Sequence, residues 1–463
     1  MRVVVGRTFT VLLEARQARY ECRKCKMMIS SFSRDGVASF ARSSLGRRVV
    51  TRTHRGSRSL SKYTNPPGPT PPLFAVSASN LLLDPSQWVY PHLNQLQQLP
   101  EVSQALSSAI PSKDILDGLG RAVDIFSNVQ EDLHRACLVL LAACQQRSGD
   151  YKEAHKTLLK LQQQSTGNVI EDIQLSLARS KVLWLSGDCI PAKALCDDIL
   201  KQPDLPFPLL ISAQTGQAVN RLLLVTCIDD VFSVRDPFRM AVKAIESARG
   251  AASPNMLAMA HLNMGVAEAA YVQVISNERG ETVPYDAALR AWKQGLTILK
   301  RAAGGGSDPW KRALQARLHT NMAWGLLQMK SEPNHVERAS EFARDALKVY
   351  DEQPTNNDEE ALYKEGLGRT LTLAATCYHQ ASNAVTAEGL LQSAIDEIYA
   401  LSSSSPLDQV ALREAYRAYA ALCRDWDKRN RDAEKMNDQA EAVQDSLPII
   451  WQTKSDVYSS LWF

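Results

Sequence analysis

The chain has 463 residues, of which 45% are hydrophobic and 7% aromatic, and its mean hydropathy is −0.24. No apolar run approaches the roughly 20 residues that a membrane-spanning helix needs, so the sequence predicts no transmembrane segment. The net charge of +3 conceals an asymmetry, because residues 1–63 hold 15 Lys and Arg against three Asp and Glu. The remainder holds 38 basic and 47 acidic residues, a balance that argues against nucleic-acid binding by the body of the chain.

The basic charge belongs to an N-terminal leader. Between Gly36 and Leu83 there is no acidic residue, and arginines alternate with Ser and Thr, a composition typical of an organellar presequence. Arg58–Ser61, RSLS, is similar to the matrix-peptidase pattern and predicts cleavage after Leu60. We therefore expect residues 1–60 to be a presequence, with Met28 as an alternative start, and the protein to enter the mitochondrial matrix. A plastid address and an untargeted cytoplasmic tail are the alternatives.

A proline-rich stretch follows the leader. Asn65–Phe74 reads NPPGPTPPLF, and proline at this density favours an extended spacer over a packed element. We expect residues 61–85 to be a linker and the folded part to begin at residue 86. A chain of 463 residues is long enough for one extended array or for two to three compact domains.

The stretch SGDYKEA, Ser148–Ala154, stands between two apolar helical patterns. Ala142 and Ala154 lie twelve residues apart and would let two helices cross closely, while Gly149 suits a turn that needs a positive φ and Tyr151 follows it. This pattern resembles the tetratricopeptide repeat, a helix–turn–helix unit of about 34 residues.

The pattern recurs with degeneration along the chain. Gly187 and Ala192 repeat the turn, and Gly118–Phe126 is similar to the second helix of an earlier unit. Further hairpins are predicted from His261–Tyr271 with Tyr285–Leu296, His319–Leu327 with Glu337–Tyr350, Leu371–Ala381 with Thr386–Ile398, and Tyr416–Cys423 with Arg431–Val443. Their small packing residues are Gly265, Ala288, Ala323, Ala339, Ala375 and Ala387. The intervals 202–217 and 302–309 are interpreted as long spacers.

The resemblance implies an all-α fold, a right-handed superhelical α-solenoid of six to seven TPR-like hairpins over residues 86–447. Stacked hairpins share one core and leave a concave groove lined by the first helix of each unit. The tail, residues 448–463, carries Trp451, Tyr458, Leu461, Trp462 and Phe463. We expect it to cap the last hydrophobic face; an aromatic anchor on a partner or a membrane surface is the alternative.

Four residues are candidates for binding in the groove. Asn263 and Asn321 stand two residues before the small residue of their helices, and Arg317 and Arg369 stand four residues before that offset. In tetratricopeptide domains that grip a peptide carboxylate, Asn and basic residues at these offsets form a clamp. Here the second basic position is Leu373, so the set is incomplete. Bonds from Asn to a peptide backbone, or bracing of neighbouring helices, are the alternatives.

The sequence contains no HExxH or GxSxG motif, and no GxGxxG that opens a helix after a strand. Cys22–Cys25, CRKC, has zinc-ligand spacing but no second pair, and the other cysteines of helical patterns are expected to be reduced core thiols. We expect neither metal nor cofactor. The resulting hypothesis is a non-catalytic scaffold for proteins or peptides, serving assembly or maturation of an organellar complex. An RNA-binding helical repeat and a non-catalytic subunit of an enzyme complex are the alternatives.

Overall fold

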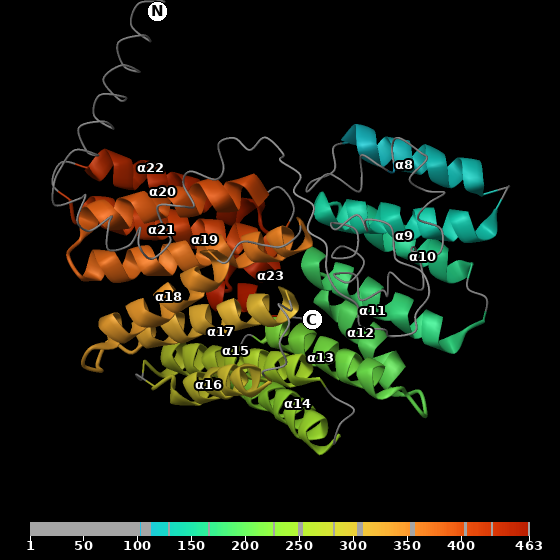
Figure 1. The fold of residues 1–463 in the computed structure, drawn as a ribbon, viewed down its shortest axis with the longest axis horizontal. Coiled ribbons are helices and arrows are strands. Elements are labelled where there is room, and N and C mark those ends of the chain that lie inside the picture. Colours follow the sequence, from blue (N-terminus) through green and yellow to red (C-terminus); the bar gives the residue numbers. More distant parts are fainter. Residues whose placement is uncertain are drawn as a thin grey trace, which may run out of the picture. The chain divides into compact units, whose positions relative to one another are not determined.

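The computed structural model describes residue 102 and residues 113–127, 130–164, 167–225, 227–248, 253–280, 283–302, 309–351, 357–401, 405–426 and 429–461. Within these ranges every element is a helix and there is no strand (Figure 1). The predicted presequence 1–60, the linker 61–85 and Cys22–Cys25 lie outside the described residues, as do Trp462 and Phe463. Apart from the last turn of α18, the described helices belong to one compact unit, residues 69–346 and 354–463.

The helices form consecutive pairs joined by short loops. Helix α8 (Lys113–Phe126) packs on α9 and precedes the pairs. The pairs are α9 (Glu131–Arg147) with α10 (Tyr151–Gln163), α11 (Val169–Ser186) with α12 (Cys189–Leu200), α13 (Phe207–Leu224) with α14 (Ile228–Ser247), α15 (Pro254–Arg279) with α16 (Asp286–Arg301), α17 (Pro309–Gln328) with α18 (His335–Asp351), α19 (Asn357–Gln380) with α20 (Ala384–Leu401), and α21 (Pro406–Arg424) with α22 (Asn430–Ser446).

Small side chains mark the helix crossings. The predicted alanines of these crossings are fully buried: Ala142, Ala154, Ala192, Ala288, Ala323, Ala339, Ala375 and Ala387. At the α11–α12 crossing, Ser180 Oγ donates a hydrogen bond to the Ala192 carbonyl at 2.8 Å. Gly149 and Gly187 have φ of +80° and +88°, values that L side chains rarely adopt. The predicted fold class, an all-α array of TPR-like hairpins, is confirmed by these pairs.

A very close crossing joins α15 to α16. A Cβ on Gly265 would lie 2.1 Å from Trp292 Nε1, so only glycine admits the indole at this position. Trp292 is fully buried and donates from Nε1 to the Leu262 carbonyl at 3.1 Å. The buried indole therefore has both an apolar environment and a hydrogen-bond acceptor.

The pair α13–α14 was not predicted from the sequence. The interval 202–217, interpreted as a spacer, contains the first half of α13. Its two prolines suit a helix start, because Pro206 is the N-cap and Pro208 occupies the first turn, where a missing N–H costs nothing. Pro237 lies inside α14, and the intervening turn contains no glycine. The usual local signals of a hairpin are thus missing here.

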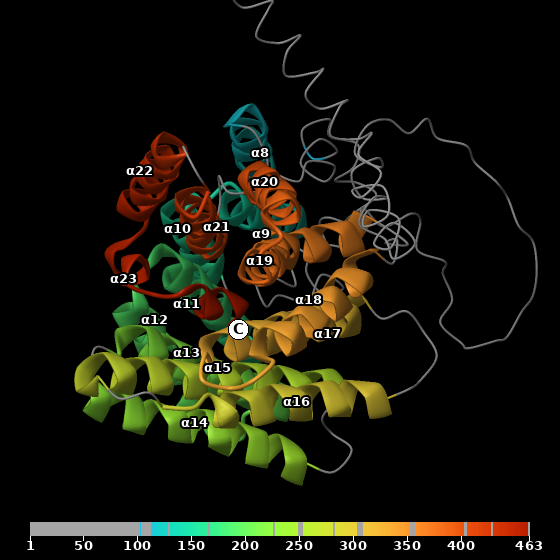
Figure 2. The same cartoon turned by 90° about the vertical axis from the view of Figure 1, so that its left-hand side faces the viewer.

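The C-terminal segment, residues 447–461, contains the short helix α23 (Ile449–Gln452) and the 3₁₀ helix η2 (Asp456–Ser460). We predicted that this tail covers the last hydrophobic face; it contacts α21 of the last pair and also α13, α15 and α17. Figure 2 shows it running from α23 toward α15 and α17. Trp451, Tyr458 and Leu461 are buried in the main core cluster, which holds residues from α11 to α21.

Candidate functional site

The first helices of six successive pairs all contact the C-terminal segment. We call the set of contacting groups on α11, α13, α15, α17, α19 and α21, including the residue that caps α13, the segment-binding face. The contacts join Trp184 to Trp451, the Val225 carbonyl to Lys454, Gln273 to Ser455, Asn321 to Ser460, Arg369 to Asp456, and Arg413 to the carbonyls of Gln452 and Lys454. One helix after another thus contributes a contact to a short, mostly non-α-helical stretch of polypeptide.

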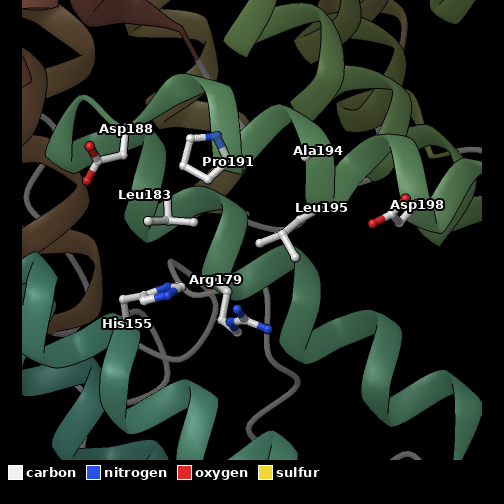
Figure 3. Close-up of a pocket in the computed structure, with 8 residues that line it drawn as sticks. All are labelled: His155, Arg179, Leu183, Asp188, Pro191, Ala194, Leu195 and Asp198. Atoms are coloured by element: carbon white, nitrogen blue, oxygen red, sulfur yellow. The ribbon is translucent and has the colours of Figure 1, made fainter.

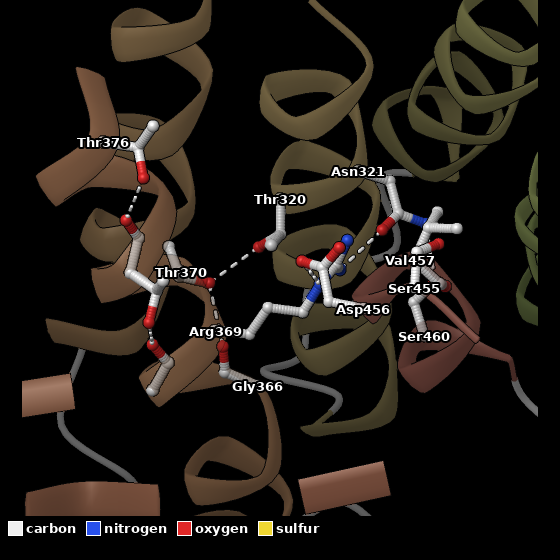
Figure 4. Close-up of polar contacts among 12 residues, drawn as sticks. Thr320, Asn321, Gly366, Arg369, Thr370, Thr376, Ser455, Asp456, Val457 and Ser460 are labelled. Carbon is white, nitrogen blue, oxygen red and sulfur yellow. Dashed lines mark hydrogen bonds and ion pairs between the residues drawn. The ribbon is translucent and has the colours of Figure 1, made fainter. Parts of the chain in front are cut away.

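Asn321 and Arg369 lie at the centre of this face (Figure 4). Arg369 Nη1 donates to Asn321 Oδ1 at 2.7 Å, and Arg369 Nε donates to Asp456 Oδ2 at 3.1 Å. Asn321 Nδ2 in turn donates to Ser460 Oγ at 2.9 Å. All four residues are buried, so the ion pair has little water to screen it. One carboxylate and one hydroxyl of the segment are therefore recognised by adjacent helices.

A pair of threonines braces the helices that hold this network. Thr320 of α17 and Thr370 of α19 share a hydrogen bond of 2.7 Å between their hydroxyl oxygens (Figure 4). Thr320 directly precedes Asn321, and Thr370 directly follows Arg369. Thr370 Oγ1 also lies 2.9 Å from the Gly366 carbonyl. This fixes the distance between α17 and α19, and with it the spacing of Asn321 and Arg369.

Arg413 of α21 binds the backbone of the segment. Its Nη1 donates to the Gln452 carbonyl at 2.7 Å and its Nη2 donates to the Lys454 carbonyl. Its Nε donates to Glu414 at 2.9 Å, and burial raises the pKa of that carboxyl, with Asp456 as a second cause. Because carbonyl oxygens occur in every peptide, Arg413 recognises polypeptide as such rather than a particular side chain.

Lys454 of the segment contacts the residue that caps α13. Its Nζ donates to the Val225 carbonyl at 3.1 Å and lies 5.4 Å from the centre of the Tyr458 ring. Burial lowers the pKa of Lys454 to about 8, and the neighbouring Cys189 opposes that shift. A charged ammonium is therefore unfavourable in this position.

Apolar groups anchor the segment beside these polar contacts. The rings of Trp184 and Trp451 meet edge to face, with centroids 5.6 Å apart. Gly187, at the end of α11, packs so closely on the segment that a Cβ would lie 2.9 Å from Pro448 Cβ. Val457 is fully buried. The face thus combines large apolar anchors with a charged pair, as tightly binding protein surfaces do.

Of the four predicted groove residues, Asn321 and Arg369 are brought together in one network. Asn263 is buried in α15, and Arg317 is half-buried one turn before Asn321 in α17. Leu373, which stands at the second basic position of a carboxylate clamp, belongs to the apolar core. The four residues stay predictions for partner binding.

Sequence reasoning missed Arg413 and the segment's own polar residues. A signal for Arg413 existed, since it lies three residues after Val410 and three before Tyr416, both buried. A charged residue on an apolar helix face requires a partner, and that partner can be a ligand. No comparable periodic signal marks Asp456 or Ser460.

A separate pocket of about 430 Å³ lies between α10, α11 and α12 (Figure 3). His155, Arg179, Asp188 and Asp198 line it together with apolar side chains. Burial and then Arg179 lower the pKa of His155, so its imidazole is neutral at pH 7. Arg179 is also hydrogen-bonded to Gln162. The pocket holds mixed charge, and it is distinct from the segment-binding face.

Within the described ranges, no group of three or more His, Cys, Asp or Glu side chains is arranged to hold a metal ion. Nor does any helix there have the length and apolarity to cross a membrane. The seven cysteines that the structure describes are free thiols. Burial raises the pKa of the Cys137 and Cys189 thiols to about 12, so both remain protonated and unreactive at neutral pH.

Comparison with known proteins gives no family: no family model matches the chain, and no curated protein matches it. Among solved structures, it is similar to the apo form of the quorum sensor NprR from B. thuringiensis, at 14% sequence identity and a TM-score of 0.39. The match covers 80% of this chain and 99% of that one. Because a TM-score of this size does not establish a common arrangement, the fold assignment rests on this chain's own helix pairs.

Proposed function

We propose that this protein is a non-catalytic scaffold that binds segments of other proteins on the first helices of its TPR-like array. The observation that carries the proposal is the segment-binding face itself. Six successive first helices hold a short, mostly non-α-helical polypeptide, and Arg413 does so through backbone carbonyls that every peptide possesses. A surface that binds one such segment has the chemistry to bind another.

Crosslinking in cells tests this proposal. A photoreactive amino acid placed at Gln273, a half-buried residue that contacts Ser455, reports what lies on the face. We expect an adduct that maps to a linear segment of a partner protein, and we expect its loss in an Arg413→Met chain that remains helical. The matched control places the same probe at Val385, an exposed residue of the second helix α20. Adducts at position 273 that join only to residues of the same chain contradict the proposal.

We also propose that the scaffold acts in the mitochondrial matrix, in the assembly or maturation of a larger complex. The support is the acid-free, arginine-rich composition of residues 36–60 and the cleavage pattern that ends at Leu60. Fusing residues 28–63 to a fluorescent reporter tests the address. We expect the reporter to colocalise with mitochondria, and a diffuse cytosolic signal would contradict the assignment. Replacing Arg42, Arg47 and Arg48 by Gln gives the matched control, which we expect to stay in the cytosol.

A further inference from the structure

We propose that the C-terminal segment is an intramolecular ligand of the segment-binding face, displaced when a partner segment of like chemistry binds there. The inference rests on the proposed function, because it assigns a regulator to the same face. Three observations carry it: the independence of the helix pairs, the polarity of the buried contact and the chemistry of the occupant.

The helices of each pair contact each other directly, apart from any contact with the segment. Helices α15 and α16, α19 and α20, and α21 and α22 contact each other directly along their lengths. Their crossings are made by residues of the pair itself, such as Gly265 with Trp292. Residues 447–461 add no hairpin of their own, only two short helical turns. Their departure would therefore leave each pair of helices intact.

The contact buries charged groups as well as the apolar side chains of the segment. It buries the cations Arg369, Arg413 and Lys454. Arg369 Nη2 and Trp451 Nε1 are buried without a hydrogen-bond partner. A buried polar group without a partner loses the water that would satisfy it in an open face. The closed state carries these unfavourable terms and the open state does not, so they offset part of the free energy that burial of Trp451, Val457 and Leu461 contributes to closure.

Like charges add to this balance. The carboxylate of Asp456 is one cause of the raised pKa of Glu414, which means that the two groups repel when the segment is bound. Glu414 forms ion pairs of 2.9 Å with both Arg413 and Arg417, so moving away from Asp456 would break these pairs. Release of the segment removes this repulsion.

The contacts define the chemistry of a competing partner. It needs a carboxylate for Arg369, a hydroxyl four residues later for Asn321, and a large aromatic anchor five residues before the carboxylate. In this chain the positions are Trp451, Asp456 and Ser460. The competitor is therefore an acidic, serine- or threonine-containing protein segment with an aromatic residue, bound through its backbone carbonyls as well.

The covalent link between the segment and the helix array favours the segment over a free peptide that competes for the same face. A covalently linked segment acts at an effective concentration in the millimolar range, so a free peptide of equal intrinsic affinity binds the intact chain far more weakly. Cutting the link without removing any residue abolishes that advantage. The apparent affinity for a free copy of the segment should then rise by roughly 100-fold or more.

The experiment uses the full chain with a protease site inserted between Asp445 and Ser446, both exposed at the end of α22. A fluorescent peptide of residues 446–461 is titrated into the cut and uncut proteins, with anisotropy reporting binding and circular dichroism reporting helix content. We expect the cut chain to take up the peptide with unchanged helicity. The Asp456→Asn peptide should bind about tenfold more weakly or worse, and the Thr453→Ala peptide, altered at an exposed position, should bind equally.

Two results would overturn the proposal: a cut chain that stays helical but never exchanges its own segment, and a chain that unfolds as the segment leaves. Its failure is distinguishable from failure of the proposed function. If the labelled peptide exchanges but the crosslinking experiment gives only same-chain adducts, the segment is a releasable ligand but partners do not displace it. If partner adducts form at position 273 but the labelled peptide does not exchange, the scaffold function stands and the segment is not an exchangeable intramolecular ligand.

Discussion

Arg369 of α19 donates a hydrogen bond of 2.7 Å to the side-chain carbonyl of Asn321 on α17, although 48 residues separate them in the chain. The same guanidinium holds the carboxylate of Asp456, and the amide of Asn321 holds the hydroxyl of Ser460. The bond between the two helices therefore orients both donors toward one occupant. Loss of either side chain disturbs the other's contact with the segment as well as its own.

Replacing Arg369 by Met tests how much this buried network contributes to the free energy of unfolding. The substitution removes the ion pair that Arg369 forms with the buried Asp456 carboxylate, and breaking a buried ion pair costs about 3 kcal/mol or more. Urea unfolding followed by circular dichroism measures the loss. The matched control is Arg338→Met, because Arg338 forms an exposed pair with Glu332 and should contribute about 1 kcal/mol or less. Equal losses in the two variants would show that the buried network adds nothing to stability.

Gly265→Ala tests the helix crossing of α15 and α16. A methyl group placed 2.1 Å from Trp292 Nε1 forces the indole away from its position and from the Leu262 carbonyl. We expect a loss of about 2–3 kcal/mol in the free energy of unfolding, measured by thermal or urea denaturation. Gly389 of α20 has open space around its Cβ position, so Gly389→Ala should instead stabilise by about 0.5–1 kcal/mol. Similar destabilisation by both variants contradicts this account of the crossing.

The hairpins could be predicted because their signals are local. Small residues such as Ala142 and Ala154 recur at fixed offsets on either side of a turn, and the same offsets placed Ala323 and Ala375 correctly at buried crossings. The pair α13–α14 escaped notice because its turn contains no glycine and its helices contain prolines. Where the chain departs from the usual turn chemistry, periodicity alone is ambiguous.

The site could be predicted in part. The offsets placed Asn321 and Arg369 on adjacent first helices, and the structure joins them in one network. The occupant could not be predicted, since Asp456 pairs with a residue 87 positions earlier and no repeat pattern relates them. Long-range pairing of this kind depends on how the helices stack, which a single sequence read locally does not contain.

Gly187→Ala tests the contact between the array and the C-terminal segment. At φ +88° an alanine costs about 1–2 kcal/mol from its backbone alone, and its Cβ would also lie 2.9 Å from Pro448 Cβ and 3.2 Å from Ile450 Cγ2. Gly167→Ala is the matched control, since Gly167 has φ +81° but no atom near its Cβ position. We expect Gly187→Ala to lose about 1–3 kcal/mol more than the control in urea unfolding. If the two variants lose the same amount, the packing of the segment on α11 does not contribute.

Lys454 predicts a specific dependence of stability on pH. Its pKa is lowered from 10.5 to about 8 in the folded chain, mainly by burial, so between these values the unfolded state binds more protons than the folded state. The contribution of Lys454 to the free energy of unfolding therefore rises as pH increases from about 8 to about 10.5, by on the order of 3 kcal/mol. Cys189 remains a thiol throughout, because burial raises its pKa to about 12. Buried tyrosines and cysteines act in the opposite direction above pH 9, so the test compares wild type with Lys454→Met at each pH. The difference in unfolding free energy, wild type minus variant, should increase between pH 8 and 10.5. A difference that stays constant or falls would show that burial does not destabilise the charged form of Lys454.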